Sequence, residues 1–349
     1  MSSEVWPDAI GRLLRREDLP TELVEQVMST ILSGDATDAQ IAGFAVALRS
    51  KGETAAELAA LVRTMLAFAE RVDLADVDGP LIDTCGTGGD RAGTVNVSTM
   101  AALVAAAGGA RVAKHGGRAS SSQCGSADVL EALGVVIDLG PDGVAHSVRE
   151  AGMGFCFAPR FHAGLRFAAP ARRELGTPTT FNFVAPLANP AGVQRQIVGV
   201  SDPAMAERLI AMLAELGAVR AFVFYGHDGL DELTVTTTST VHELHDGEMR
   251  VYDIDPEKYG ITLADRTALA GGHAAGNADV VHKVLAGASG PIRDIVALNA
   301  GAALLVADLV DDLGGGVELA NEILDDGRAA ATLEALVRVT VAARESGDA

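Results

Sequence analysis

Cysteine is scarce in this sequence of 349 residues, which contains only Cys85, Cys124 and Cys156. The number is odd, the three residues lie far apart, and none has a partner at the spacing typical of metal ligands. A disulfide framework and the common cysteine-based metal motifs are therefore excluded. We expect free, buried thiols, which persist in a reducing compartment, so the sequence predicts a cytoplasmic location.

Long hydrophobic runs are absent as well. No stretch reaches the roughly 18 consecutive apolar residues that a membrane-spanning helix needs, and the N-terminal "MSSEVWPDAI" lacks the basic-then-apolar order of a secretory signal. Hydrophobic residues nevertheless make up 48% of the chain, which is enough for a large core. We therefore expect a globular protein without membrane contact, divided by the usual size of domains into two.

Positive charge is also in short supply. The 27 Lys and Arg residues face 47 Asp and Glu residues, which gives a formal net charge of −20. Nucleic acids and anionic membranes need a basic surface, so we expect neither as a partner. Residues 111–173 differ, because eight basic residues outnumber five acidic residues there. A small anion is expected to bind in this part of the chain.

The first 70 residues carry helical signals. Residues 21–32 place their apolar side chains on one helical face, and Thr54 and Glu57 form the pattern of a capping box. From residue 81, apolar runs alternate with helical stretches, which indicates an α/β fold with a mainly parallel central sheet. The alternation breaks at "RRELGTPTTFNFVAPLANPAG", where the chain is expected to return to the helical unit.

These signals predict two domains. A small helical domain is expected over residues 1–74, with a return segment near 165–195, and a large α/β domain over 75–164 and 196–349.

The stretch "LIDTCGTGGD", residues 81–90, places a short apolar run before three glycines and an aspartate. A probable helix follows, so backbone N–H groups and a helix N-terminus would converge on one anion, most often a phosphate. A tight turn with nothing bound is the alternative. Asn96, Ser98 and Thr99 at the helix start are either N-caps or phosphate and metal ligands.

A second polar cluster lies in "AKHGGRASSSQCGSADVLEALG", where Lys114, His115 and Arg118 stand beside two glycines and several serines. Cations with hydroxyls and backbone donors suit a second phosphate, and a solvated loop is the competing interpretation. A third cluster places Asp231 beside Glu232. Adjacent carboxylates repel unless a hard cation or a basic partner holds both, so this pair is either a magnesium site or an exposed acidic turn.

Several motifs in this order and spacing resemble the anthranilate phosphoribosyltransferase family of tryptophan biosynthesis. They are "DTCGTGGD", "TVNVST", "VAKHGGRASSSQCGSADVLEALG", "FNFVAPLANPAG", "HDGLDELT" and "RDIVALNAGAAL". The resemblance covers almost the whole chain. It implies a fold shared with pyrimidine nucleoside phosphorylases, in which a small α-helical domain is hinged to a large α/β domain. It further implies a homodimer whose two copies pair through their helical domains. It also implies 5-phosphoribosyl 1-pyrophosphate as donor, anthranilate as acceptor, and Mg2+ as cofactor.

The resemblance assigns site residues by position. The implied donor-binding residues are Gly86, Thr87, Gly88, Gly89, Asp90, Thr94, Asn96, Val97, Ser98, Thr99, Lys114, His115, Gly116, Gly117, Arg118, Ala119, Ser120, Ser121, Ser122 and Ser126. The implied acceptor-binding residues are Gly86, Gly117, His115, His162, Arg172 and Pro186, and the implied metal ligands are Ser98, Asp231 and Glu232. Arg172 would pair with the carboxylate of anthranilate, and His162 and Pro186 would line the acceptor tunnel.

The sequence departs from the family pattern at two positions. The family usually has Lys-His-Gly-Asn-Arg where this chain has Lys-His-Gly-Gly-Arg, so Gly117 stands in place of the asparagine. The family usually has Gly-Pro-Leu where this chain has Ala-Pro-Leu, so Ala185 stands in place of the glycine. The missing amide removes one hydrogen bond to the acceptor, a loss on the order of 1 kcal/mol. Three alternatives to anthranilate transfer follow: transfer to a different aromatic amine, a nucleoside phosphorylase of the same fold, and a non-catalytic relative that binds nucleic acid, which the charge disfavours.

Overall fold

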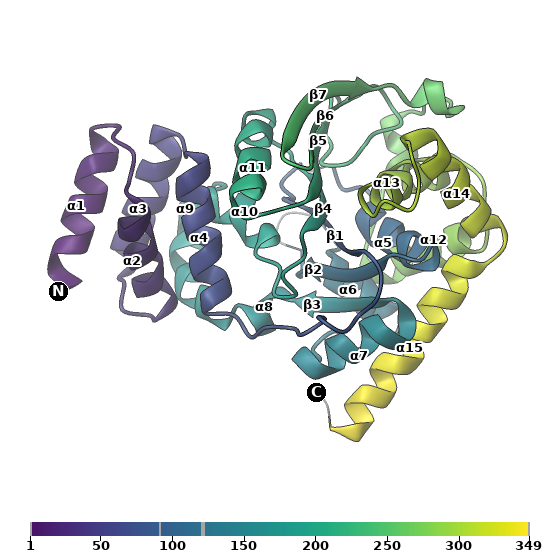
Figure 1. Ribbon diagram of the computed structural model, residues 1–349, viewed down its shortest axis with the longest axis horizontal. Helices are drawn as coiled ribbons and strands as arrows, with labels where there is room; N and C mark the ends of the chain where they lie inside the picture. Colours follow the sequence, from purple (N-terminus) through teal and green to yellow (C-terminus); the bar gives the residue numbers. More distant parts are fainter. Residues whose placement is uncertain (1, 91, 120–122, 348–349) are drawn as a thin grey trace.

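The computed structural model describes residues 2–90, 92–119 and 123–347. Figure 1 shows a helical bundle at one end of the long axis and a sheet with flanking helices at the other. The helices before the third strand are α1 (Ser2–Leu14), α2 (Thr21–Leu32), α3 (Asp38–Lys51), α4 (Ala55–Ala67), α5 (Val97–Ala107), α6 (Ser126–Ala132) and α7 (Pro141–Ala151). Those after it are α8 (Ala158–Phe161), α9 (Ala169–Leu175), α10 (Thr180–Val184), α11 (Pro203–Glu215), α12 (Ala274–Leu285), α13 (Pro291–Val306), α14 (Leu313–Asp325) and α15 (Arg328–Ser346).

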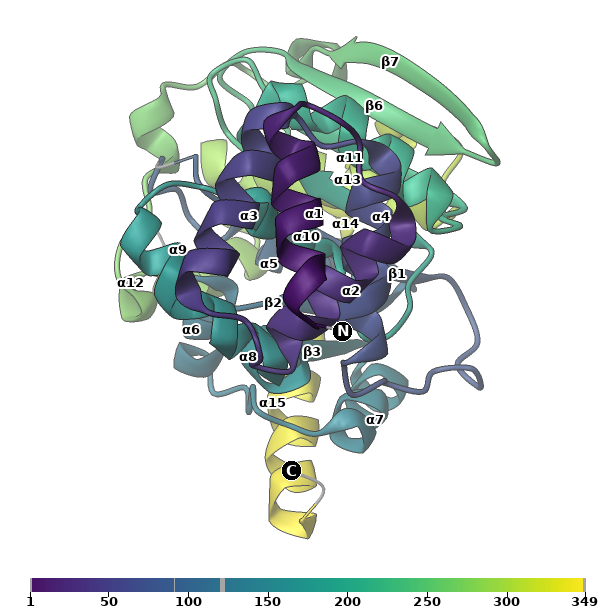
Figure 2. The same ribbon diagram turned by 90° about the vertical axis from the view of Figure 1, so that its left-hand side faces the viewer.

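The N-terminal helices α1 to α4 pack as a bundle, which faces the viewer in Figure 2. The helix predicted over residues 21–32 is confirmed, because α2 spans Thr21–Leu32 and buries its apolar face. The predicted capping box is confirmed too: Thr54 Oγ1 accepts from the Glu57 N–H at 3.2 Å, and a Glu57 carboxylate oxygen accepts from the Thr54 N–H at 2.8 Å. This reciprocal pair satisfies two N–H groups that the first turn of α4 leaves without helical partners.

One mixed sheet of seven strands forms the other part, as the alternating pattern predicts. The strands are β1 (Leu81–Gly86), β2 (Arg111–Gly116), β3 (Met153–Phe157), β4 (Arg195–Gly199), β5 (Arg220–Gly226), β6 (Ser239–His245) and β7 (Glu248–Ile254), in the order β3-β2-β1-β4-β5-β6-β7. The first five in this order are parallel, and β6 and β7 form an antiparallel extension. Strand order reverses between β1 and β4, where Gly86 pairs with Gly199. Ligands of open α/β sheets bind at such a switch point, beyond the carboxyl ends of the strands.

Two large hydrophobic clusters hold the layers together. One lies on the sheet face covered by α5 and α13, and it includes Met100, Leu103 and Leu298. The other joins the interior of the helical bundle to the opposite sheet face, with Phe44 and Leu61 from the bundle and Val198 and Val223 from the sheet. The bundle is therefore attached to the sheet through a continuous apolar core.

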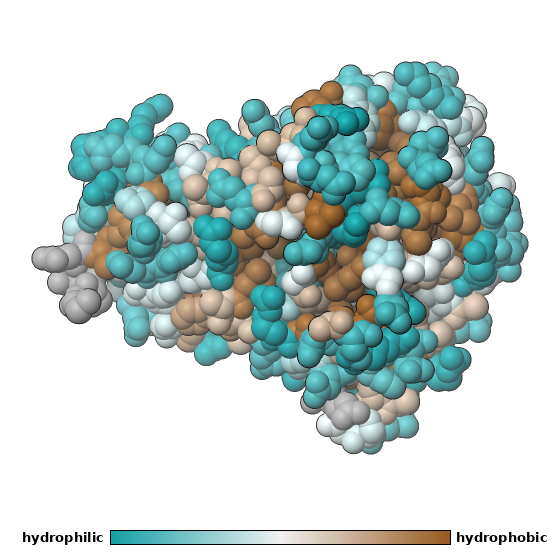
Figure 3. Space-filling view, in the orientation of Figure 1, coloured by the Kyte–Doolittle hydropathy of each residue, from teal (hydrophilic) through white to brown (hydrophobic). Residues whose placement is uncertain are grey.

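Two helices after β3 pack against the N-terminal helices. Helix α9 contacts α3, and α10 contacts both α3 and α4. On the face shown in Figure 3, hydrophobic residues gather near the middle, and polar residues cover much of the remainder. None of the helices in the described part of the chain has the length and apolarity to cross a bilayer.

Candidate active site

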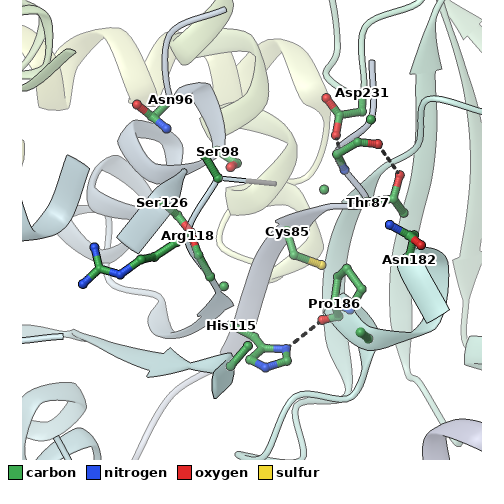
Figure 4. A pocket seen from close by; sticks show the side chains of 18 of the residues that line it. Cys85, Thr87, Asn96, Ser98, His115, Arg118, Ser126, Asn182, Pro186 and Asp231 are labelled. Carbon is green, nitrogen blue, oxygen red and sulfur yellow. Dashed lines mark hydrogen bonds between the residues drawn. The ribbon is translucent and has the colours of Figure 1, made fainter. Parts of the chain in front are cut away.

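A cavity of about 620 Å³ opens at the switch point. Its wall is built from the ends of β1 and β2, the start of α5, the loop after β5, and the segment from α8 to Pro186 (Figure 4). Every predicted site residue that the structure describes lines it: Gly86, Thr87, Gly88, Gly89, Asp90, Thr94, Asn96, Val97, Ser98, Thr99, Lys114, His115, Gly116, Gly117, Arg118, Ala119, Ser126, His162, Arg172, Pro186, Asp231 and Glu232. Ser120, Ser121 and Ser122 lie outside the described residues.

The glycine loop leaves β1 directly toward the cavity. Gly88 and Gly89 adopt φ of +64° and +89°, which L side chains rarely reach, so the turn favours glycine at both positions. The loop is fixed from β4, because Thr87 N–H donates to the Gly199 carbonyl at 2.9 Å and Ser201 Oγ donates to the Gly88 carbonyl at 2.8 Å. The result is a preformed concave backbone of the kind that binds phosphate.

Asp231 and Glu232 are partly buried in the loop after β5, so the alternative of an exposed acidic turn is wrong. Asp231 Oδ2 accepts from Gly88 N–H at 2.8 Å, and Glu232 Oε1 accepts from Ser98 N–H at 3.2 Å. Burial, reinforced by the nearby Asp90 carboxylate, raises the pKa of Asp231 to about 7. Burial and the Asp231 carboxylate hold the pKa of Glu232 well above its usual range. Two desolvated carboxylates side by side are unfavourable unless a cation joins them.

The residues around this pair fit a magnesium ion. The donor set consists of carboxylate oxygens with the Ser98 hydroxyl nearby, and Asp90 Oδ2 is buried without a described partner. Within the described ranges, no cluster of three or more His, Cys, Asp and Glu could hold a metal by itself. That suits Mg²⁺, which usually binds through one or two carboxylates and completes its shell with substrate phosphates and water.

A buried asparagine holds the acidic loop in place. The side chain of Asn299, on α13, accepts from Leu233 N–H at 3.0 Å and donates to the Leu233 carbonyl at 2.9 Å. Asp228 fixes the start of the same loop by accepting from the hydroxyls of Thr234 and Thr236 at 2.7 and 2.5 Å. The positions of Asp231 and Glu232 are thus set by tertiary hydrogen bonds on both sides.

Lys114 is fully buried beneath the glycine loop. Its ammonium donates to the carbonyl of Thr84 and lies 3.3 Å from Ser98 Oγ. Burial lowers its pKa, whereas the nearby carboxylate of Asp83 acts in the opposite direction. Burial also raises the pKa of Asp83 to about 6, opposed by Lys114 and by a hydrogen bond of 2.8 Å from Asn189 Nδ2. This polar network sits directly under the place where an anion would bind.

Two histidines, His115 and His162, line the cavity. His115 Nδ1 lies 3.0 Å from the Pro186 carbonyl, which can only accept, so Nδ1 carries the proton. Burial, with His162 as the second cause, lowers the pKa of His115 to about 3, which keeps the ring neutral. The remaining nitrogen, Nε2, is therefore a hydrogen-bond acceptor, and it is buried without a described partner. His162, 5.1 Å away between ring centroids, donates from Nε2 to the Ala188 carbonyl at 2.7 Å.

Arg172 brings a positive charge into the cavity from α9. Its guanidinium lies 5.9 Å from the centroid of the Phe181 ring, and within the described residues it forms no ion pair. Burial lowers its pKa. A guanidinium that is partly desolvated and unpaired presents a site for a carboxylate or a phosphate.

The remaining predicted residues differ in orientation. Asn96 does not cap α5: its side chain donates to the Cys124 carbonyl at 3.1 Å and accepts from Asn277 at 2.8 Å. The guanidinium of Arg118 binds Asp128 and Glu131 at 2.9 and 2.8 Å and points away from the cavity centre in Figure 4. Gly117 leaves open space, because an added Cβ would meet no atom within 4 Å.

Asn182 also lines the cavity, and sequence reasoning did not single it out. The sequence signal at Asn182 was weak. A single amide between two aromatic residues, Phe181 and Phe183, is typical of an ordinary polar position in a short helix. Only the placement of α10 against α3 and α4 turns this side chain into the cavity wall. The sequence predicts only a buried thiol for Cys85, and this residue also lines the cavity.

Comparison with known proteins matches the two parts of the chain to two family models. The sequence matches the "Glycosyl transferase family, a/b domain" over residues 78–330 and the "Glycosyl transferase family, helical bundle domain" over residues 7–69. It is 52% identical to an anthranilate phosphoribosyltransferase of Nocardioides sp., over 96% of this chain and 98% of the relative. It is 53% identical to one of Acidothermus cellulolyticus, over 97% of this chain and 96% of the relative.

Solved structures give the same result. The crystal structure of the anthranilate phosphoribosyltransferase of Thermus thermophilus matches with a TM-score of 0.90 and 41% identity, over 96% of this chain and 99% of that chain. The enzyme of Saccharomyces cerevisiae, in complex with phosphoribosyl pyrophosphate and magnesium, matches with a TM-score of 0.88 and 26% identity, over 97% and 99% of the two chains.

Proposed function

The chain belongs to the anthranilate phosphoribosyltransferase family, and from that premise we propose the chemistry of its cavity. The protein is a pentosyltransferase of tryptophan biosynthesis. It transfers the 5-phosphoribosyl group of phosphoribosyl pyrophosphate to the amine of anthranilate, giving N-(5-phosphoribosyl)anthranilate and pyrophosphate. The observation that carries the assignment of roles is the grouping in one cavity of a glycine loop, two partly buried carboxylates and an arginine that forms no ion pair with the described residues.

The donor side is assigned to the large domain. The backbone N–H groups of the Gly86 to Asp90 loop bind the pyrophosphate, and Lys114 beneath it offsets the negative charge. Asp231, Glu232 and Ser98 hold magnesium, which supplies charge neutralisation to the departing pyrophosphate when bound. Leaving-group charge is the main obstacle in this reaction, so most of the acceleration comes from positioning and electrostatics.

The acceptor side is assigned to the wall that carries Arg172, His115 and Pro186. Arg172 pairs with the carboxylate of anthranilate, and the amine attacks the anomeric carbon of ribose with inversion through an oxocarbenium-like transition state. The amine of an aniline is neutral at pH 7 and needs no strong base. The unprotonated Nε2 of His115 accepts a hydrogen bond from that amine, and its low pKa keeps it in the accepting form.

Domain division, oligomeric state and location are further parts of the proposal. We assign residues 1–74 and the return segment near 165–195 to the small domain, with the remainder in the large one. The helical bundle exposes Leu14, Val46 and Phe68 by 75%, 46% and 47%, which supports pairing of two copies through this part. The absence of a disulfide among Cys85, Cys124 and Cys156 in the described part of the chain supports a cytoplasmic location.

The test of the function is the loss of anthranilate fluorescence. Purified protein is mixed with phosphoribosyl pyrophosphate, Mg²⁺ and anthranilate, and a chelator serves as control. Rapid, chelator-sensitive loss is the expected result. If anthranilate persists while the folded protein still binds the donor, the phosphoribosyl site serves another aromatic amine.

The open space at Gly117 favours that second candidate and gives a prediction. Gly117→Asn should fold normally, because an added Cβ meets no atom and the φ of this residue is outside the left-handed region. The new amide restores one hydrogen bond to the acceptor, worth about 1 kcal/mol, so the anthranilate KM should fall roughly fivefold. Steady-state kinetics with both substrates measures the change.

Gly276→Asn is the matched control for this substitution, since Gly276 is equally open but lies outside the cavity lining. Its kinetic constants should equal those of the unmodified protein. An anthranilate KM that stays constant or rises in Gly117→Asn would mean that the open space accommodates a different acceptor.

A further inference from the structure

Asn182 lies in the middle of α10, and the oxygen of its side-chain amide already accepts hydrogen bonds. Its Oδ1 accepts from Thr179 N–H at 3.0 Å and from Thr179 Oγ1 at 3.3 Å. A backbone N–H can only donate, so the oxygen of the amide must face Thr179 and the nitrogen must face the other way. Figure 4 shows this nitrogen turned toward the centre of the cavity.

The two N–H groups of this amide have no partner among the described residues. Asn182 lines the cavity, while its neighbours Phe181 and Phe183 are 1% and 4% exposed. Polar hydrogens that line a partly desolvated cavity are satisfied by a ligand or by water. The short helix thus presents one oriented double donor to whatever the cavity binds.

The position of Asn182 is anchored from behind by a buried charged network. Thr180 Oγ1 donates to Glu53 Oε1 at 2.6 Å, and the Glu53 side chain is fully buried. Glu53 Oε2 accepts from Arg208 at 3.0 Å and from Arg49 at 3.3 Å. Arg49 in turn lies 4.8 Å from the centroid of the Phe183 ring.

This anchoring ties α10 to three other elements. Arg49 and Glu53 lie on α3 and in the turn before α4, and Arg208 lies on α11. The backbone on both sides of Asn182 is therefore held before any ligand arrives. A donor fixed in advance loses little conformational entropy when it binds, which is the condition for a selective contact.

Arg172 and Asn182, both from the return segment, line the same wall of the cavity. Arg172, from α9, lies over the ring of Phe181, the residue that precedes Asn182. The opposite wall, built from β1 and the loop after β5, carries the glycine loop and the acidic pair. Since the opposite wall already serves the pyrophosphate, the donors of this wall are left for the acceptor.

We propose that Asn182 is a specificity-determining residue that donates a hydrogen bond to the carboxylate of the aromatic acceptor and, with Arg172, orients the ring. This inference rests on the proposed function. A carboxylate has two oxygens with several lone pairs, so it can accept from a guanidinium and an amide together. The guanidinium supplies the charge, and the amide restricts rotation of the ring about the carboxylate, which directs the ortho amine toward ribose.

Two substitutions separate this contact from the structural role of Asn182 in α10. Asn182→Asp keeps an oxygen that accepts from Thr179, so the helix cap survives, but it replaces the donor with a negatively charged acceptor. Asn182→Ala removes both the cap and the donor. Kinetics with each substrate varied in turn, together with thermal melting, distinguishes the two roles.

The expected order is opposite for the two roles. If Asn182 binds the carboxylate, Asn182→Asp raises the anthranilate KM about 100-fold and Asn182→Ala about tenfold, because the aspartate also repels the substrate. The donor KM then stays within about twofold, and Asn182→Asp melts at the temperature of the unmodified protein.

Three results would overturn the inference. Normal anthranilate kinetics in Asn182→Asp with impaired stability in Asn182→Ala would leave only the capping role. A rise in the donor KM instead of the anthranilate KM would place the amide on the pyrophosphate. Equal loss with anthranilate and with aniline, which lacks the carboxylate, would also contradict it. If the unmodified protein leaves anthranilate unconsumed, the proposed function itself fails, so the two failures are distinguishable.

Discussion

Replacing Asp231 by Asn and Glu232 by Gln together is expected to lower kcat/KM for phosphoribosyl transfer by roughly 10³-fold or more. A metal that stabilises transition-state charge contributes several kcal/mol, and each 1.36 kcal/mol corresponds to a factor of about ten. The amides keep the size of the carboxylates but lose the charge that attracts Mg²⁺. Turnover measured over a range of Mg²⁺ concentrations should show no recovery at high metal.

The fold is expected to survive this double substitution. Asn and Gln each keep an oxygen that can accept the hydrogen bonds from Gly88 N–H and Ser98 N–H. The two amides cannot ionise, so the variant also avoids the cost of placing two partly buried carboxylates side by side. The melting temperature without metal should therefore equal or exceed that of the unmodified protein.

The pH dependence of this stability has a defined sign. The pKa of Asp231 is raised to about 7 by burial, so the folded protein holds this proton more tightly than the unfolded chain does. Its ionisation costs stability as the pH rises from about 4, the value in an unfolded chain, toward 7, and the cost is complete above that range. The gain in melting temperature of the double variant should accordingly be larger at pH 8 than at pH 4.

A matched control changes the same two residue types on the surface. Asp246→Asn with Glu248→Gln alters the exposed turn after β6 and the exposed first residue of β7, and it should leave both activity and metal dependence unchanged. Metal-dependent turnover that persists in the Asp231 and Glu232 variant would remove this pair from the active site. A lowered melting temperature would instead show that the two charges support the fold.

The sequence predicts the strand and the glycine turn at the cavity well because their signals are local. The apolar run ending at Gly86 and the glycines after it define a strand and a turn within ten residues, and both lie where they were expected. The adjacent carboxylates Asp231 and Glu232 leave a cation site and an exposed acidic turn open, and the structure rules out the exposed turn because both residues are partly buried at the cavity. The parallel order of the first five strands follows from the alternation of apolar runs and helical stretches.

The rest depends on contacts between residues far apart in the chain. Asp83 lies within β1, and its carboxylate is buried and accepts a hydrogen bond from Asn189, 106 positions later. Glu53 anchors Thr180 across 127 positions, which no local pattern reveals. Asn96 occupies the start of α5 and suggests a cap, yet Cys124 and Asn277 take its side chain. In each case the tertiary partner decides the role.

Arg172→Ala is expected to lower kcat/KM for anthranilate about 100-fold while the donor KM changes by less than about twofold. A hydrogen bond to a charged group is worth about 1.5–3 kcal/mol, and a guanidinium that pairs with a carboxylate uses two such bonds. The loss should be confined to acceptors that carry a carboxylate. Steady-state kinetics with each substrate in turn gives this comparison.

Arg172→Lys and Arg173→Ala make the test specific. Lysine keeps the charge but lacks the planar fork, so Arg172→Lys should retain part of the activity. Arg173 is the exposed neighbour on α9 and does not line the cavity, so its replacement should have no kinetic effect. An equal rise in both KM values in Arg172→Ala would contradict a role restricted to the acceptor.

The stability of Arg172→Ala separates binding from folding. Arg172 has no ion-pair partner in the described part of the chain, and burial disfavours its charged form. Its removal should therefore leave the melting temperature unchanged or raise it slightly, whereas a structural arginine would lower it on removal. A partly desolvated guanidinium that does not stabilise the fold indicates a role in binding a ligand that pairs with it. Anthranilate should therefore stabilise the unmodified protein but not Arg172→Ala.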